Sequence, residues 1–456
     1  MFEWKVNRMM KTSTFTSIKE AVDDIPVIDI HTHTGGNNIW QARNLTDLLY
    51  YHWLAFELRA AGCPDEVWRG ALREQDPKES IRKALPYCMK AYNTTMHFAL
   101  RGILKDLYGL DIKRTIDKSN YETVFQAVSD KAQDPSWEHE VLKRGKIEFN
   151  SVEYRDLQGR RNRPVPPPGY FTYAYFEPFY GAGLEGLPDQ QRQPPGADFK
   201  SQVGADVKNA EGLDRAITAH ISKLVRDHKI KALHVWLPYN WRYRDNATKS
   251  HRLDELIVRW DGKGNRTAPY SGGGNLTMEE RNLLSSFSAD VCARECGKHG
   301  LVIQMFYGSK SYVGGPQVNV YEPEWIRALI PHIAKHPETK FDLFLATRNL
   351  SLEMTVLSRM YPNLMASGAW WHGFTPQTYT TFYRDRLELL PYTSWTAFLS
   401  DAYCAEWIYG KLFVVKNRLS VALTQLVEEK FFSEEMAIDI AKAVLYENPK
   451  TIYGLG

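Results

Sequence analysis

Cysteine is scarce in this sequence, with five residues in 456, an odd number thinly spread along the chain. So few cysteines argue against a disulfide framework and favour a reducing compartment, so we expect a cytoplasmic protein. Cys292 and Cys296 lie one helical turn apart in "ADVCARECGKHG". No second Cys or His pair stands nearby at zinc-site spacing, so we interpret this pair as helix packing.

Long apolar runs and blocks of like charge are also missing. The first residues, "MFEWKVNRMMKTSTFTS", lack the apolar core of a signal peptide, and no stretch approaches the length of a membrane span. The formal net charge of +3, from 57 basic and 54 acidic residues, is too small to argue for nucleic acid or an anionic membrane. We therefore expect a small-molecule partner, and we also predict a homo-oligomer.

Short apolar runs alternate with longer segments of helical periodicity, the pattern of a parallel sheet wrapped by helices. We predict eight strands, the number that closes a barrel. They are Val27–Ile30, Ile147–Val152, Tyr170–Phe176, Ala232–Leu237, Leu301–Phe306, Phe341–Leu345, Leu364–Ser367 and Ala397–Leu399. The predicted fold class is α/β, a (β/α)8 barrel in which residues 1–456 form one domain.

The interval between the first two predicted strands is too long for a single crossover helix. Within it, "LTDLLYYHWLAFELRAAG" and "TTMHFALRGILKDLYG" have the periodicity of amphipathic helices, which predicts a helical insertion over residues 41–144. Insertions at this edge of a barrel lie over the C-terminal ends of the strands, where active sites sit. The insertion is therefore a candidate substrate lid.

Two histidines one residue apart follow the first predicted strand in "IPVIDIHTHTGG". Alternation along a strand turns His31 and His33 to the same side, so two imidazoles converge. Asp401 ends the last predicted strand, which neighbours the first in a closed barrel. The alternative to a metal role is that the two histidines are only hydrogen-bonded strand residues and that Asp401 caps the N-terminus of the following helix. We predict a divalent metal site, with zinc as the default and manganese or iron as alternatives.

Several motifs resemble the uronate isomerases of the amidohydrolase superfamily over nearly the whole chain. They are the HxH, the "LRAAG" helix, "SGAWW", "FLSD" and the closing "NPKTIYGL". The resemblance implies a metal-dependent (β/α)8 barrel that interconverts aldehyde uronates, such as glucuronate or galacturonate, with ketose uronates through an enediol. It also implies that His31, His33 and Asp401 hold the metal.

The resemblance also suggests groups for proton transfer. In the family's insertion helix a tyrosine follows a histidine in the words "DHYKW", whereas "YYHWL" here has Trp53 after His52. Tyr50 or Tyr51, one turn away, could substitute. The candidate catalytic residues are Asp401, Tyr50, Tyr51 and His52.

The residues expected to bind the substrate differ from the family pattern. The family's "DSR" after the last strand is "DAY" here, and its Trp-Arg-Pro near strand three is replaced by "YFEPFYG". A buried uronate carboxylate needs a cationic partner, which arginine supplies best. The fifth predicted strand also offers Phe306 where the family has a histidine. Our candidate substrate-binding residues are His234, Trp370, Trp371, His372, Tyr403 and Arg348.

The sequence thus predicts a metal-dependent aldose-ketose isomerase for a uronate or related sugar. One alternative is a hydrolase, lyase or decarboxylase that uses the same metal. The superfamily's hydrolases usually add a lysine or histidine from strand four and a histidine from strand five, and here only His234 is available. A second alternative is a non-catalytic sugar-binding protein.

Overall fold

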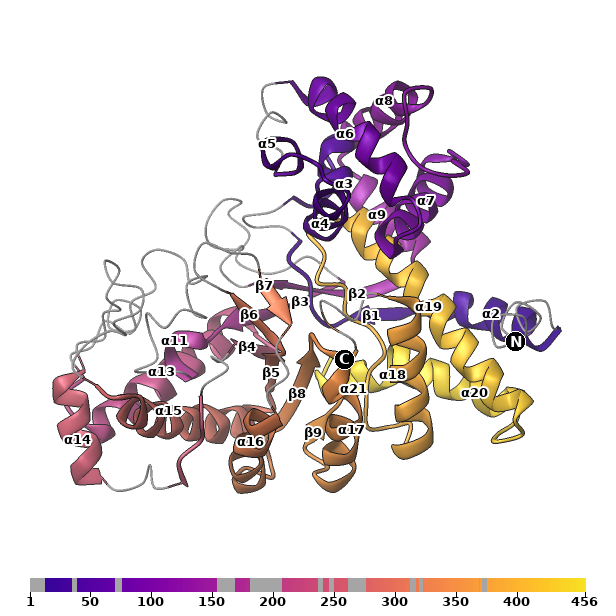
Figure 1. Ribbon diagram of the computed structural model, residues 1–456. Coiled ribbons are helices and arrows are strands. Elements are labelled where there is room, and N and C mark those ends of the chain that lie inside the picture. Colours follow the sequence, from indigo (N-terminus) through magenta and orange to yellow (C-terminus); the bar gives the residue numbers. More distant parts are fainter. Residues whose placement is uncertain are drawn as a thin grey trace.

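Parallel strands in one curled sheet form the centre of the molecule (Figure 1). The computed structural model describes residues 13–34, 39–69, 76–153, 169–180, 207–236, 241–245, 250–260, 276–311, 317–319, 323–368, 370 and 375–456. In these residues the sheet runs in the order β1-β2-β3-β4-β5-β8-β9. The strands are β1 (Val27–Asp29), β2 (Ile147–Glu153), β3 (Tyr170–Tyr175), β4 (Ala232–Trp236), β5 (Val302–Tyr307), β8 (Lys340–Leu345) and β9 (Leu364–Met365).

These strands confirm the first seven predicted strands, and the fold is a (β/α)8 barrel with a helical insertion between its first two strands. The eighth prediction was wrong in detail, because Ala397–Leu399 forms no regular strand. This segment still closes the barrel beside β1. The main-chain N–H of Asp401 donates to the carbonyl of His31 at 2.9 Å, and that of His33 donates to Ala402 at 2.8 Å. Asp401 has a left-handed backbone (φ 51°), which interrupts the regular ladder.

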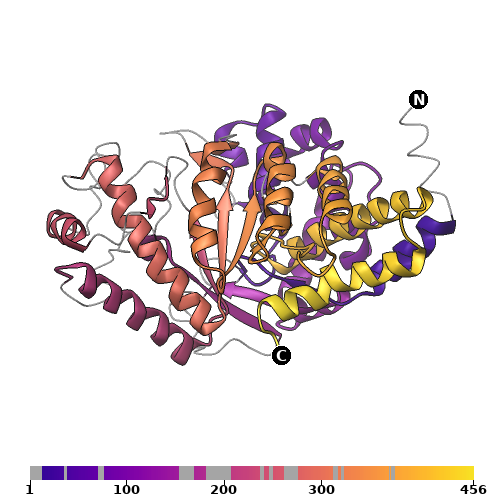
Figure 2. The ribbon, with the colours of Figure 1, turned by 90° about the horizontal axis from the view of Figure 1, so that it is seen from below.

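Helices lie around the outside of the sheet, as Figure 2 shows from below. They are α13 (Ala210–His228), α14 (Ser250–Arg259), α15 (Met278–His299), α16 (Pro323–Lys335), α17 (Ser351–Met360), α18 (Pro376–Leu389), α19 (Ala405–Glu428) and α20 (Glu434–Lys442). The sequence signals for α15 are confirmed: Thr277 forms a capping box with Glu280, and Gly300 ends the helix in a left-handed conformation. No helix of the described residues is long and apolar enough to cross a membrane.

Other elements accompany these helices and strands. They are the helices α2 (Ser13–Asp24), α11 (Glu177–Tyr180) and α21 (Asn448–Ile452), the π-helical turn Ala443–Glu447, the 3-10 turn η3 (Arg348–Leu350), and the antiparallel pair β6 (Ser309–Ser311) and β7 (Gln317–Asn319). The pair β6 and β7 directly follows β5, so it lies at the C-terminal end of the barrel strands (Figure 1).

The helices between β1 and β2 form a separate lobe at the top of Figure 1. They are α3 (Leu45–Leu49), α4 (His52–Ala60), α5 (Asp65–Trp68), α6 (Pro77–Ala91), α7 (Thr95–Tyr108), α8 (Tyr121–Ala132) and α9 (Trp137–Arg144). Glu406, buried at the start of α19, ties this lobe to the barrel. Its carboxylate accepts hydrogen bonds from the Ala42 N–H (3.0 Å), Trp137 Nε1 (3.0 Å) and the Tyr108 hydroxyl (3.1 Å). The lobe is therefore attached to the barrel at the first turn of α19, which directly follows the closing segment.

Candidate metal centre

His31, His33 and Asp401 meet where β1 and the closing segment end. His33 Nε2 lies 3.0 Å from Asp401 Oδ1, and His31 Nε2 lies 3.9 Å from the same oxygen. One nitrogen or oxygen atom from each residue lies within 4.8 Å of the others. Between the histidines, Thr32 points the other way, and its hydroxyl donates to the Ser151 carbonyl of β2 at 2.8 Å. This alternation directs both imidazoles into the barrel.

Hydrogen bonds to Gln304 on β5 define the proton position of His31. Both amide hydrogens of Gln304 are used, on the Ile30 carbonyl (2.8 Å) and the Tyr453 hydroxyl (2.9 Å). Gln304 Oε1 is therefore left as an acceptor for His31 Nδ1, at 3.2 Å. With its proton on Nδ1, His31 presents the Nε2 lone pair to Asp401. This Nε2 is buried and has no hydrogen-bond partner among the described residues.

The same network continues through the barrel core to β8. Tyr453, from the closing "NPKTIYGL" motif, donates its hydroxyl hydrogen to Asp342 Oδ2 at 2.7 Å. Burial raises the pKa of Asp342 to about 7, although hydrogen bonds from Ser367 and Tyr453 lower it. The C-terminal motif thus supports the orientation of His31 through Tyr453 and Gln304.

Burial and charge place His31 and Asp401 in the protonation states that a metal needs. Burial and the neighbouring His33 and His234 hold the pKa of His31 well below its ordinary value, so its imidazole is neutral. Burial opposes ionisation of Asp401, but the hydrogen bond and charge of His33, with the charge of Lys411, hold its pKa below the ordinary range. A neutral imidazole and an ionised carboxylate are ligand forms that bind a divalent ion, and His31 and Asp401 have these forms.

Lys411 of α19 lies buried beneath Asp401. Its ammonium group donates to the main-chain carbonyls of Ser400 and Asp401, the latter at 3.3 Å. It also lies 4.9 Å over the ring of Tyr51. Burial lowers the pKa of Lys411 to about 7, although the Asp401 charge acts in the opposite direction. Lys411 therefore supports the backbone that carries Asp401.

Aromatic rings line the site on the β3, β4 and β5 side. The His234 ring stacks on Phe306 at a centroid distance of 4.4 Å and lies 5.3 Å from the ring of His31. Phe306 itself lies 4.7 Å from the His31 ring. The Tyr175 hydroxyl is 3.2 Å from His33 Nδ1. Phe306 thus places a hydrocarbon ring from β5 next to the imidazoles of His31 and His234.

The three tyrosines singled out in the sequence have different surroundings. Tyr51 donates its hydroxyl hydrogen to the Asp401 carbonyl at 3.0 Å, so the insertion reaches the site. The Tyr403 ring lies 5.5 Å from His33 and 5.6 Å from Tyr51. Tyr50 turns away and donates to the Ser80 carbonyl at 2.7 Å. The structure therefore brings Tyr51 and Tyr403 to the cluster, but not Tyr50.

The remaining candidates are less well placed or lie outside the description. Trp370 is buried, and its ring meets Phe306 edge to face at 4.9 Å. Arg348 is exposed on η3, just beyond the C-terminal end of β8. His52 begins α4, but its side chain is outside the described part of the chain, as are Trp371 and His372.

Four contributors to the site escaped the sequence predictions: Gln304, Tyr453, Lys411 and Tyr175. Gln304 carried a readable signal, because it is a lone amide in the apolar run "LVIQMF" and shares a strand face with Phe306. Lys411 gave none, because lysines are mostly exposed on helices.

The geometry defines a (β/α)8 barrel with a candidate divalent-metal site at the C-terminal end of its strands. The buried lone pair of His31 Nε2, the neutral imidazole of that residue and the ionised Asp401 all fit such an ion. Within the described residues, a second group of potential ligands lies outside the barrel, namely Asp290, His332 and His336.

No family model matches the sequence, and no curated protein matches it. Solved structures do match in fold. Glucuronate isomerase from Caulobacter crescentus is 19% identical, with a TM-score of 0.77 over 97% of this chain and 94% of that one. Uronate isomerases from Thermotoga maritima and Bacillus halodurans C-125 are 14% and 18% identical, with TM-scores of 0.76 and 0.70 over 98% of each chain. At these identities the likeness establishes the shared fold.

Gln304→Leu is expected to weaken metal binding by about 10- to 100-fold, as loss of an outer hydrogen-bond partner typically does. The substitution leaves His31 Nδ1 without its acceptor. Titration with Zn²⁺ against a competing chelator would measure the change. Gln425→Leu, on the half-buried surface of α19, is the matched control and should bind as the wild type does. Equal affinity in the two variants would contradict the assigned role of Gln304.

Asp342→Asn is expected to change how stability depends on pH. Because the pKa of Asp342 is about 7 in the fold against an ordinary 3.8, the folded state binds the extra proton between these values. Stability should therefore fall as pH rises through this window, by up to about 1.4 kcal/mol per pH unit. Urea unfolding at pH 5, 6 and 7 should show this decline in the wild type and a smaller one in Asp342→Asn. Parallel pH profiles would refute the assignment.

Proposed function

We propose that this protein is a metal-dependent isomerase that interconverts the aldose and ketose forms of a uronate or related sugar. The observation that carries the proposal is the convergence of His31, His33 and Asp401 at the C-terminal end of a barrel whose fold matches uronate isomerases. Zinc is the proposed ion, with manganese or iron as alternatives, because two imidazoles and one carboxylate suit all three.

The proposed chemistry moves a proton between C2 and C1 of the sugar. A divalent ion held by the three ligands would supply a Lewis acid for a substrate oxygen. Asp401 is the proposed base, because it is ionised and lies at the centre of the cluster. Tyr51 is a weaker candidate, since burial raises its pKa well above the ordinary value and its hydroxyl already bonds the Asp401 carbonyl. Tyr51 then positions Asp401.

The side chains around the cluster suggest how a sugar would be held. Phe306, His234 and Trp370 offer ring faces and edges, which pack well against the apolar faces of sugars. The hydroxyl of Tyr175 and the ring of Tyr403 border the half-exposed side of His33. Arg348 remains the proposed cation for a substrate carboxylate, since it is exposed beyond the end of β8. Binding of neutral sugars would be compatible with the same aromatic surroundings.

The sequence alternatives receive less support. The β5 position that the superfamily's hydrolases fill with a histidine holds Phe306, packed against His31. A buried set of potential ligands with an unpartnered His31 Nε2 argues against a protein that only binds sugar. The barrel by itself does not decide the reaction, because this fold hosts many chemistries.

All five cysteines are buried and form no disulfide, which supports the proposed cytoplasmic location. Self-association stays a prediction.

Proton NMR in deuterated water tests the reaction. The metal-loaded protein, incubated with glucuronate, galacturonate and the corresponding neutral aldoses, is expected to yield ketose signals with solvent deuterium at C1. Addition of chelator should abolish them. His31→Ala should lower kcat/KM by at least about 100-fold, since a lost Lewis acid is worth several kcal/mol, and leave the fold intact by circular dichroism.

His251→Ala is the matched control, because this imidazole lies on the exposed face of α14 and is 91% accessible. It should retain wild-type activity. Absence of turnover across the whole panel, from protein that retains its metal, would reject isomerisation and favour another reaction on this scaffold. Full activity of His31→Ala would reject the metal role.

A further inference from the structure

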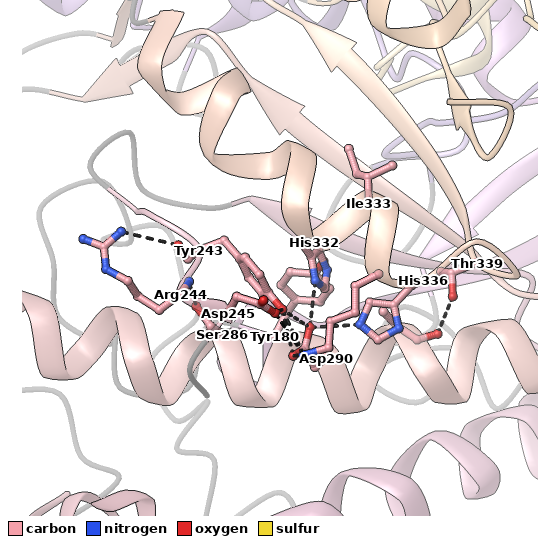
Figure 3. Close-up of polar contacts among 12 residues, drawn as sticks. Tyr180, Tyr243, Arg244, Asp245, Ser286, Asp290, His332, Ile333, His336 and Thr339 are labelled. Atoms are coloured by element: carbon pink, nitrogen blue, oxygen red, sulfur yellow. Dashed lines mark hydrogen bonds and ion pairs between the residues drawn. The ribbon is translucent and has the colours of Figure 1, made fainter. Parts of the chain in front are cut away.

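A second group of potential metal ligands lies between two outer helices, away from the barrel interior (Figure 3). Asp290 comes from α15, His332 from the last turn of α16, and His336 follows that helix directly. Because His332 and His336 are four residues apart, their rings lie on the same side. His332 Nδ1 is 3.0 Å, and His336 Nε2 is 2.9 Å, from one atom, Asp290 Oδ1.

This oxygen is crowded with polar neighbours. Besides the two imidazole nitrogens, the Tyr243 hydroxyl lies 3.0 Å from Asp290 Oδ1 and 3.0 Å from Oδ2. The Tyr243 hydroxyl can donate to Oδ2, which leaves Oδ1 facing the two imidazole nitrogens alone. Oδ1 and the two nitrogens are therefore the three atoms that one ion could share, with Tyr243 bonded to Oδ2.

The surroundings supply the outer partners that metal-bound imidazoles need. The second nitrogen of His332 contacts the buried hydroxyl of Tyr180, which would orient the ring when Nδ1 binds an ion. Lys335 donates to Asp290 Oδ2 at 2.7 Å and lies 3.5 Å from Asp245. That second carboxylate adds negative charge beside the cluster, which offsets the ammonium group.

Burial is also suitable for a bound ion. The His332 side chain is fully buried, whereas the side chains of Asp290 and His336 each keep 12% of their surface accessible. The cluster is therefore open on one side, where water could complete a tetrahedral set of ligands.

We propose that Asp290, His332 and His336 bind a second divalent transition-metal ion, with Zn²⁺ as the best match for two nitrogens and one oxygen. This ion joins α15 to α16 on the outside of the barrel. It has no contact with the barrel ligands and stabilises the helix layer rather than taking part in the reaction. The inference is independent of the proposed function.

Metal stoichiometry tests the second site. After equilibration with Zn²⁺ and removal of unbound ion, elemental analysis should give two ions per chain for the wild type. His31→Ala/His33→Ala should keep one, and Co²⁺ in that background should give the visible absorption of a four-coordinate site. Adding His336→Ala should remove this ion and its spectrum. It should also remove the rise in Tm that Zn²⁺ produces in the double variant.

Two controls separate ligand loss from general damage. His299→Ala removes an exposed imidazole at the end of α15 and should leave the second ion in place. Lys335→Gln removes the neighbouring cation but no ligand, so the ion should be retained. The proposal is wrong if the double variant binds no Zn²⁺, or if its ion survives both His336→Ala and Asp290→Asn. The first result would identify the cluster as a hydrogen-bond network around Lys335. Neither result depends on isomerase activity.

Discussion

The closure of the barrel between β1 and the segment before α19 is the contact on which the candidate site depends. Asp29, buried on β1, accepts a hydrogen bond from the Ser400 N–H at 2.9 Å, and the backbones of His31 and Asp401 pair directly. The second contact joins residues that are 370 positions apart in sequence, since Asp401 follows His31 by that interval. Without this closure the two imidazoles and the carboxylate would not lie close together in space.

The closure is not a regular strand pair, and this irregularity sets the direction of the Asp401 side chain. A residue in the left-handed region bends the chain so that its side chain leaves the ladder direction, and aspartate tolerates that backbone better than most residues. At Asp401 the bend directs the carboxylate to the imidazoles while the main chain still bonds β1. Lys411 and Tyr51 then bond the Asp401 carbonyl from the other side.

The sequence predicted the strands well because most are short apolar runs between helical segments, with nearly all of their residues buried. It also predicted that His31, His33 and Asp401 come together, since strand alternation and barrel closure are simple geometric rules. It did not predict the irregular eighth segment, because a single left-handed residue leaves no mark in composition. Nor did it find Asp290 with His332 and His336, because the histidine pair is local but its carboxylate lies 42 positions earlier.

Tyr51 has a consequence for how the insertion can behave. It lies at the junction of α3 and α4, bonds the Asp401 carbonyl, and stacks on Trp407 of α19 at 4.7 Å. A rotation of the whole lobe would therefore break a contact with the residue that carries the carboxylate. Glu406 of α19 holds Tyr108 of α7 and Trp137 of α9 in the same way. Closing over a substrate would therefore be confined to the helices between these anchors, with the anchored helices acting as a fixed wall of the site.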